Sequence, residues 1–228
     1  MAGIGTLGEK SLHRMLKWHY EPTGKFHEVS VGRYIADIKQ NEHIMEIQTR
    51  QWHKLRDKLN HFLPDYIVTV VYPVVYDKRL LWVDGHDSVI RSRRSPKHST
   101  YQTAFIELYA IKSLLTHKNL RLRLVMVCVD EKRGERGNPG ANHVPGAHHD
   151  KIDTILRSVA AELVIESPAD YAKLLPPGLG ERFTSQDYAT FAHINKRLAG
   201  VSLNVLLSVG TVKRVGKLGR CFLYERAQ

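Results

Sequence analysis

The sequence has few cysteines and no long apolar stretch. Its 228 residues include only two cysteines, Cys128 and Cys221, and both lie in apolar, strand-like runs. Two isolated thiols argue against a disulfide framework or a cysteine-ligated zinc module and favour reduced side chains in the cytoplasm. There is no run of about 18 apolar residues, so we expect no membrane-spanning helix. The first 14 residues lack the apolar core of a signal peptide, which argues against secretion.

Acidic residues are also in short supply. The chain has 23 Asp and Glu against 34 Lys and Arg, which gives a formal net charge of +11. Such an excess of positive charge favours an anionic partner, most often a nucleic acid. The composition, 43% hydrophobic and 25% charged, is that of an ordinary globular protein and excludes a disordered chain.

The first 75 residues alternate helix and strand patterns. A helix is expected over residues 6–19, with Thr6 as N-cap and Glu9 three residues later. Three strand patterns follow, at residues 27–31, 33–38 and 43–49. A helical period over 51–62 then precedes the β-branched run 66–71, which is typical of a strand buried on both faces. This order predicts an α/β fold with a mixed sheet.

The middle of the chain is harder to assign. The patterns predict a strand at 79–84, a basic connector at 91–97, a helix at 101–115, a strand at 120–129, a Gly- and Pro-rich loop at 130–150 and a helix at 151–165. Pro176, Pro177 and Gly178 then indicate a linker over 168–181. We therefore predict a first domain at 1–167 and a second at 182–228.

The second domain has the pattern of a winged helix-turn-helix. Helices are expected from Thr184 or Ser185 to 189, over 191–198 and over 201–209, with a turn at Ala199-Gly200. Strands at 211–215 and 220–225 flank a basic, Gly-rich tip. In this arrangement the third helix enters the major groove and the hairpin, or wing, meets phosphates.

The expected DNA contacts follow from that geometry. Ser202 and Asn204 are predicted to face outward on the third helix. Four cations lie on or beside the wing: Lys213, Arg214, Lys217 and Arg220. A winged helix used for protein contacts is the alternative.

Two carboxylates are predicted to meet on neighbouring strands. If Gln40–His43 is a four-residue hairpin loop, Asp37 and Glu46 lie directly across from each other, and Gln48 shares the face of Glu46. Two adjacent carboxylates repel each other, and a divalent cation such as Mg²⁺ or Mn²⁺ between them removes that repulsion. Such an ion would stabilise the charge on a phosphodiester and activate a water molecule. Solvated charges on an edge hairpin are the simpler alternative.

The segments GEKSLHRML, YIADI and IMEIQT together resemble the PD-(D/E)XK nuclease superfamily. The resemblance covers about residues 5–75 and implies a restriction-endonuclease-like αβββαβ core. It assigns Glu9 to the helix Glu, which a capping box explains equally well, and Asp37 to the strand Asp. Glu46 matches the Glu of Glu-x-Lys, while Gln48 stands where the superfamily usually has Lys. The whole chain also resembles a bacterial family that joins this core to a winged helix.

The resemblance implies a Mg²⁺-dependent endonuclease that acts on duplex DNA, and by analogy a homodimer. Asp37 and Glu46 would hold the metal, Gln48 would position water and Glu9 would assist. Because Gln48 lacks the usual positive charge, Lys54 or Lys58 on the following helix are candidates to supply it. The main alternative is a non-catalytic DNA-binding regulator with a degenerate nuclease-like domain. A scaffold that uses both domains for protein contacts is a third.

Overall fold

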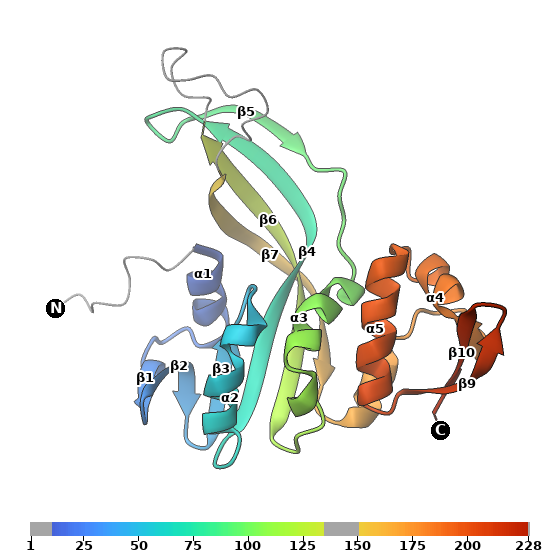
Figure 1. Ribbon diagram of the computed structural model, residues 1–228. Coiled ribbons are helices and arrows are strands. Elements are labelled where there is room, and N and C mark those ends of the chain that lie inside the picture. Colours follow the sequence, from blue (N-terminus) through green and yellow to red (C-terminus); the bar gives the residue numbers. More distant parts are fainter. Residues whose placement is uncertain (1–10, 135–150, 228) are drawn as a thin grey trace, which may run out of the picture.

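The structure is a computed structural model that describes residues 11–134 and 151–227 (Figure 1). Its centre is a seven-stranded mixed sheet in the order β1-β2-β3-β4-β6-β7, with β5 paired to part of β4. The strands are β1 (His27–Val31), β2 (Tyr34–Gln40), β3 (His43–Ile47), β4 (Ile67–Val83), β5 (Val89–Arg94), β6 (Leu120–Gly134) and β7 (Lys151–Ile165). The α/β class with a mixed sheet is therefore confirmed.

The sheet has an antiparallel half and a parallel centre. β1, β2 and β3 form an antiparallel meander, and β3, β4 and β6 are parallel to one another. β4 has 17 residues, which span about 55 Å at the usual rise per residue. Its second half leaves β3 behind and continues with β5, β6 and β7 as a curved arm (Figure 1).

Three elements of this arm differ from the sequence predictions. The strand expected at 79–84 is the continuation of β4, and the connector expected at 91–97 is largely β5. The helix expected at 151–165 is wrong, because this segment is strand β7, antiparallel to β6. Residues 151–165 have apolar side chains at spacings that suit either structure, and pairing with the long β6 decides between them.

Helices cover both faces of the sheet. The N-terminal helices are α1 (Ser11–Tyr20), η2 (Trp52–Lys54), α2 (Arg56–Phe62), η3 (Tyr101–Ala104), α3 (Phe105–Ala110) and η4 (Lys112–Leu114). Leu16 of α1 belongs to a cluster with Val71, whereas Phe62 of α2 and Phe105 of α3 belong to a cluster with Val70. Because neighbouring strand residues point to opposite faces, Val70 and Val71 each anchor one layer.

The C-terminal part contains η5 (Pro168–Leu174), β8 (Arg182–Thr184), α4 (Ser185–Phe191), α5 (Lys196–Ser208), β9 (Val212–Leu218) and β10 (Cys221–Arg226). The three strands form an antiparallel sheet in the order β8-β10-β9. The helix predicted at 191–198 and the turn at Ala199-Gly200 are wrong. The Asn195 side chain caps α5 by accepting the Leu198 N–H at 2.8 Å, so the helix starts earlier and continues through Gly200.

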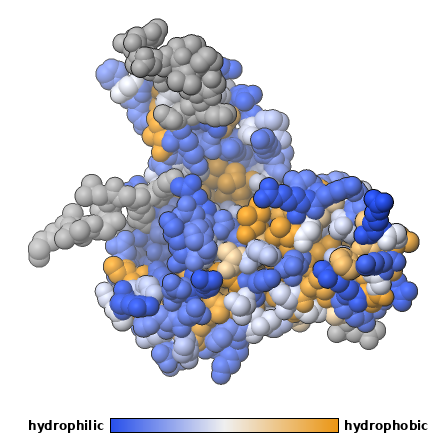
Figure 2. Space-filling view, in the orientation of Figure 1, coloured by the Kyte–Doolittle hydropathy of each residue, from blue (hydrophilic) through white to orange (hydrophobic). Residues whose placement is uncertain are grey.

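The C-terminal part is packed against the sheet domain. Residues 168–181 were expected to form a linker, but Tyr171 and Leu174 of η5 are buried, and the Tyr171 hydroxyl donates to the Leu115 carbonyl at 3.1 Å. Leu203 of α5 belongs to the same buried cluster as Phe105 of α3. Figure 2 shows hydrophobic side chains at the surface where α3 faces α5. The two parts therefore share one core.

The longest helix among the described residues is α5, with 13 residues. None of the described helices has the length and apolar character needed to cross a membrane.

Candidate functional site

The regular backbone pairing between β2 and β3 ends next to Asp37 and Glu46. Its regular pairs run from Gln40–His43 to Ile38–Met45. The loop is therefore Asn41 and Glu42, two residues long where four are expected, but the register of the strands is the same. Asp37 and Glu46 stand at the next position of this register, where the sequence predicts that they oppose each other. Regular pairing stops before them, and their side chains enter the hydrogen bonding of the backbone.

Where this pairing ends, the carboxylates of Asp37 and Glu46 accept hydrogen bonds from backbone N–H groups of the opposite strand. Oδ2 of Asp37 accepts the N–H of Ile47 at 2.8 Å, and the N–H of Asp37 donates to Oε1 of Glu46 at 3.3 Å. Each acidic side chain is thus tied to the other strand. Both carboxylates are thereby held by hydrogen bonds to the backbone of the neighbouring strand.

A distortion on β1 lies on the other side of Asp37. The β1–β2 pairs His27–Ile38 and Val29–Ala36 flank it, and Glu28 between them has a φ of +52°, a left-handed conformation that costs energy for a non-glycine residue. The Glu28 side chain accepts from the buried Lys17 of α1 at 2.9 Å. Strain of this kind is concentrated where a protein positions functional groups.

Glu46 is a buried acid with a lysine partner. It is only 2% exposed, and Nζ of Lys58, on α2, lies 2.5 Å from its Oε2. Burial raises the pKa of Glu46 to about 8, and the negative charge of Asp37 adds to this effect while Lys58 opposes it.

Asp37 has the opposite tendency. Nε2 of His13, on α1, lies 3.1 Å from Oδ2 of Asp37. Burial alone would raise the pKa of Asp37, but the hydrogen bond from His13 and the charges of His13 and Lys58 hold it below its ordinary value. Two neighbouring carboxyl groups whose pKa values are pushed apart are typical of acid–base and metal sites.

The remaining predicted site residues do not join this pair. Glu9 lies outside the described residues. The side chain of Gln48 donates to the Arg50 carbonyl at 2.5 Å, and its backbone N–H donates to Val71 at 2.9 Å. Within residues 11–134 and 151–227, Gln48 forms no hydrogen bond with either carboxylate, so its expected role in positioning water is not supported by this arrangement.

Sequence reasoning named Lys58 only as a candidate and missed His13. The signal for His13 was its spacing, because it follows Glu9 by four residues and therefore shares the same face of a helix. The signal for Lys58 was its place on the helix that follows Gln48 in the chain. In both cases the contact depends on how a helix packs on the hairpin, which the sequence does not show.

The hairpin of β9 and β10 displays the cations predicted for it. Lys213, Arg214, Lys217 and Arg220 are all exposed. The Arg214 guanidinium lies 4.1 Å from the ring centre of Phe222, and Lys213 pairs with Glu225 at 3.1 Å. Arginine stacked on an aromatic ring is held in a fixed orientation while its charge stays available to a partner.

The predicted outward positions on α5 are wrong. Ser202 is fully buried and donates to the Leu198 carbonyl at 2.8 Å. Asn204 is half-buried and its Oδ1 accepts from Lys112 at 3.1 Å. The error follows from the packing of α5 against α3, which buries this face and which the sequence does not show. The face of α5 that was expected to read DNA is inside the protein.

Within the described ranges, no three His, Cys, Asp or Glu side chains gather into a group that could hold a metal ion.

Comparison with known proteins places the sheet domain in a family. The family described as "Domain of unknown function (DUF8091)" matches residues 10–166, and the chain belongs to it. The matched range runs from α1 to the end of β7. An "Uncharacterized protein" of Treponema pallidum (strain Nichols) is 32% identical over 137 residues, which are 58% of this chain and 55% of that protein. The chain thus matches little more than half the length of this relative. No solved structure matches.

Proposed function

We propose that the protein is a metal-dependent endonuclease that hydrolyses phosphodiester bonds of DNA at Asp37 and Glu46. The observation that carries this proposal is the end of the regular pairing between β2 and β3, where two carboxyl groups with diverging pKa values are held together. Keeping both of them ionised without a cation is unfavourable, so the pair is suited to bind one.

The element order supports the same proposal. The chain runs α1, β1, β2, β3, α2, β4, which is the αβββαβ order of the PD-(D/E)XK nucleases that the sequence resembles. Asp37 and Glu46 lie on the two hairpin strands where that superfamily has its acidic residues.

The donor set fits a hard divalent ion. Carboxylate oxygens are the ligands that Mg²⁺ and Mn²⁺ prefer, and Mg²⁺ keeps several waters, so a few protein ligands suffice. Oδ1 of Asp37 accepts no hydrogen bond from the described residues and is open for coordination. When bound, the ion would offset the charge on the phosphate and lower the pKa of a water molecule.

Lys58 supplies the cation that Gln48 lacks. Its ammonium group reaches Glu46 from α2, whereas in the usual motif a lysine follows the glutamate on the same strand. With a metal ion held by Asp37 and Glu46, the ammonium group of Lys58 would be placed to hold a phosphate oxygen or the attacking water. His13 keeps Asp37 ionised and oriented.

For DNA contact we propose that η5, α4, α5 and the β8-β10-β9 sheet form a winged helix that binds through its hairpin. The exposed Lys213, Arg214 and Lys217 would meet phosphates, and Phe222 would keep Arg214 in place. Because α5 is buried against α3, binding would depend on phosphates more than on base edges. A homodimer remains part of this proposal.

One observation favours a second function, a non-catalytic DNA-binding regulator. Lys58 and His13 already provide Glu46 and Asp37 with cationic or hydrogen-bonding partners. A site that is satisfied in this way can persist as a structural ion-pair cluster after catalysis has been lost.

Plasmid nicking and linearisation with Mg²⁺ or Mn²⁺ tests the first function against the second. We expect cleavage that EDTA abolishes, and we expect Asp37→Asn to remove cleavage while DNA binding stays intact. Asp57→Asn, an exposed carboxylate on α2, is the matched control and should cleave normally. Wild-type protein that binds DNA but cleaves no duplex or branched substrate would favour the regulator. Cleavage that survives in Asp37→Asn would refute the site.

A further inference from the structure

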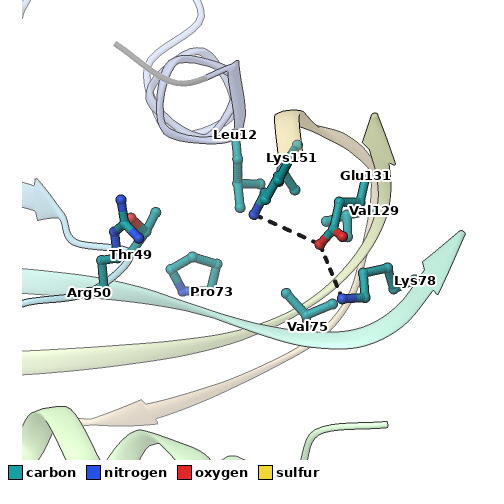
Figure 3. Close-up of a pocket in the computed structure, with 10 residues that line it drawn as sticks. Leu12, Thr49, Arg50, Pro73, Val75, Lys78, Val129, Glu131 and Lys151 are labelled. Carbon is teal, nitrogen blue, oxygen red and sulfur yellow. Dashed lines mark hydrogen bonds and ion pairs between the residues drawn. The ribbon is translucent and has the colours of Figure 1, made fainter. Parts of the chain in front are cut away.

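A cavity of about 250 Å³ lies between α1 and the arm of the sheet, separate from the carboxylate pair (Figure 3). Leu12 lies above it, and Pro73 and Val75 lie below it. Thr49 and Arg50, which follow β3, stand at one side, while Lys78, Glu131 and Lys151 stand at the other. The cavity therefore has apolar surfaces above and below and charged groups at both ends.

The end of the cavity at Lys78, Glu131 and Lys151 is rich in cations. Glu131 is 5% exposed and accepts from Lys78 at 3.1 Å and from Arg133 at 2.8 Å, and Lys151 lies 3.8 Å from it. Although burial opposes ionisation, the hydrogen bonds from Arg133 and Lys78 hold the pKa of Glu131 below its ordinary value. Glu131 thus has three cationic neighbours, of which Lys78 and Lys151 line the cavity.

The opposite end carries a cation without a partner. The Arg50 guanidinium forms no ion pair or side-chain hydrogen bond with any residue in the ranges 11–134 and 151–227; only its backbone carbonyl is engaged, by Gln48. Arginine presents several donors in a planar arrangement that matches phosphate oxygens.

A buried hydroxyl group in the cavity wall is also unsatisfied. Thr154 of β7 lines the cavity and is 6% exposed, and its Oγ1 has no hydrogen-bond partner among the described residues. It lies directly across the strand pair from Glu131. Leaving a buried hydroxyl without a partner costs free energy, and a ligand that supplies the partner recovers it.

The cavity is held open by its surroundings. Ser11, at the start of α1, donates through its hydroxyl to Asp153 of β7, the residue before Thr154. This bond fixes α1 over the arm. Below, Val75 and Val129 belong to strands β4 and β6, which are paired from Val68–Leu120 to Val83–Gly134 with one irregularity, between Val75 and Asp77. The cavity is therefore part of the folded domain and does not require a loop to close.

We propose that this cavity is a phosphate-binding pocket, in which Arg50 and the cations around Glu131 hold the phosphate, Thr154 completes its hydrogen bonds, and the apolar surfaces contact the attached nucleoside. The phosphate belongs either to a free mononucleotide or to a nucleotide of a DNA strand. The proposal does not depend on cleavage at Asp37 and Glu46.

The direct test is isothermal titration of the full chain with deoxyadenosine 5′-monophosphate, deoxyadenosine and a short duplex. We expect the monophosphate to bind and the nucleoside to bind at least about tenfold more weakly, because charge-assisted bonds to phosphate are lost. Arg50→Gln should weaken binding by about 10- to 100-fold. Arg91→Gln, on exposed β5 away from the cavity, is the matched control and should not change it.

Thr154→Val tests whether the Thr154 hydroxyl contacts the ligand or is only a buried group without a hydrogen-bond partner. Valine has the same shape and removes the unsatisfied hydroxyl, so the melting temperature of the free protein should rise. Affinity for the monophosphate should nevertheless fall about 3- to 10-fold, because the hydroxyl no longer donates to the phosphate. A melting temperature that rises with unchanged affinity would contradict a role of Thr154 in binding.

The source of the phosphate is decided by comparing the two probes. Binding of the monophosphate that depends on Arg50 indicates a free nucleotide. Binding of the duplex alone, again dependent on Arg50, indicates a backbone phosphate. If neither probe depends on Arg50, the pocket proposal is wrong. Asp37→Asn should bind as the wild type does, so a failure of the endonuclease proposal would leave this result unaffected.

Discussion

Lys58 on α2 donates to Glu46 on β3 at 2.5 Å, from a helix that follows the strand hairpin in the chain. The lysine and the glutamate are twelve residues apart, whereas the superfamily motif places them two apart. Under the proposed function, Lys58 would supply from α2 the positive charge that the motif supplies from the strand.

The first prediction concerns this lysine. Lys58→Ala should reduce Mg²⁺-dependent cleavage by at least about 100-fold, because the cation that faces the phosphate is lost. Lys54→Ala, an exposed lysine one turn earlier, should have little effect. In the Lys58→Ala background, Gln48→Lys should restore part of the activity, since it returns a cation to the strand. Equal loss in both single variants would show that only general charge matters.

The second prediction concerns the pH dependence of stability. Folded Glu46 keeps its proton up to about pH 8, while an unfolded glutamate loses it near 4.3. Between these values the folded state binds more protons, so this group lowers the free energy of unfolding as pH rises. Glu46→Gln removes the effect. In urea unfolding, the free energy of unfolding of the variant relative to the wild type should be larger at pH 8 than at pH 5 by about 1 kcal/mol or more. A difference that is constant with pH would contradict the raised pKa.

The third prediction concerns DNA binding by the hairpin. Affinity for duplex DNA should fall steeply with salt, with each phosphate contact contributing about 0.9 to the slope of the log–log plot. Replacing Lys213, Arg214 and Lys217 with alanine should flatten that slope by about 2 to 3. Ser202→Ala should leave it unchanged, because Ser202 is buried. Binding that does not respond to salt would exclude the phosphate-based mode.

The fourth prediction concerns the shared core. Leu203→Ala should lower the free energy of unfolding of the whole chain by about 2 to 5 kcal/mol, in a single transition, because Leu203 packs in the same cluster as Phe105. Leu218→Ala, on the exposed hairpin, should change it by less than about 0.5 kcal/mol. Calorimetry checks both variants. An early separate transition in Leu203→Ala would indicate that the C-terminal part unfolds independently.

The sequence was sufficient for features that depend on neighbouring residues. The polar turn at Gln40–His43 and the period of two residues in strands predict the register that brings Asp37 beside Glu46, and both signals are local. The three strands of the meander were also found close to their observed bounds.

Features that depend on distant partners could not be predicted in this way. Residues 151–165 are a strand because β6 offers an edge that pairs with them from Lys151 to Ile165, with three irregularities. The start of α5 was missed because Gly200 was read as a turn, although the Asn195 cap and the packing against α3 outweigh the cost of a glycine inside a helix. His13 reaches Asp37 only because α1 lies over the hairpin.

The burial of α5 against α3 has a consequence for where DNA would be cut. A tethered binding module can swing on its linker, and cleavage then spreads over many positions. Here the β9–β10 hairpin, which contains Arg214, follows α5, and α5 is packed into the core. The distance between this hairpin and Asp37 is therefore set by the fold. Under the proposed function, the protein would therefore cut DNA at one fixed number of base pairs from the segment that the hairpin binds.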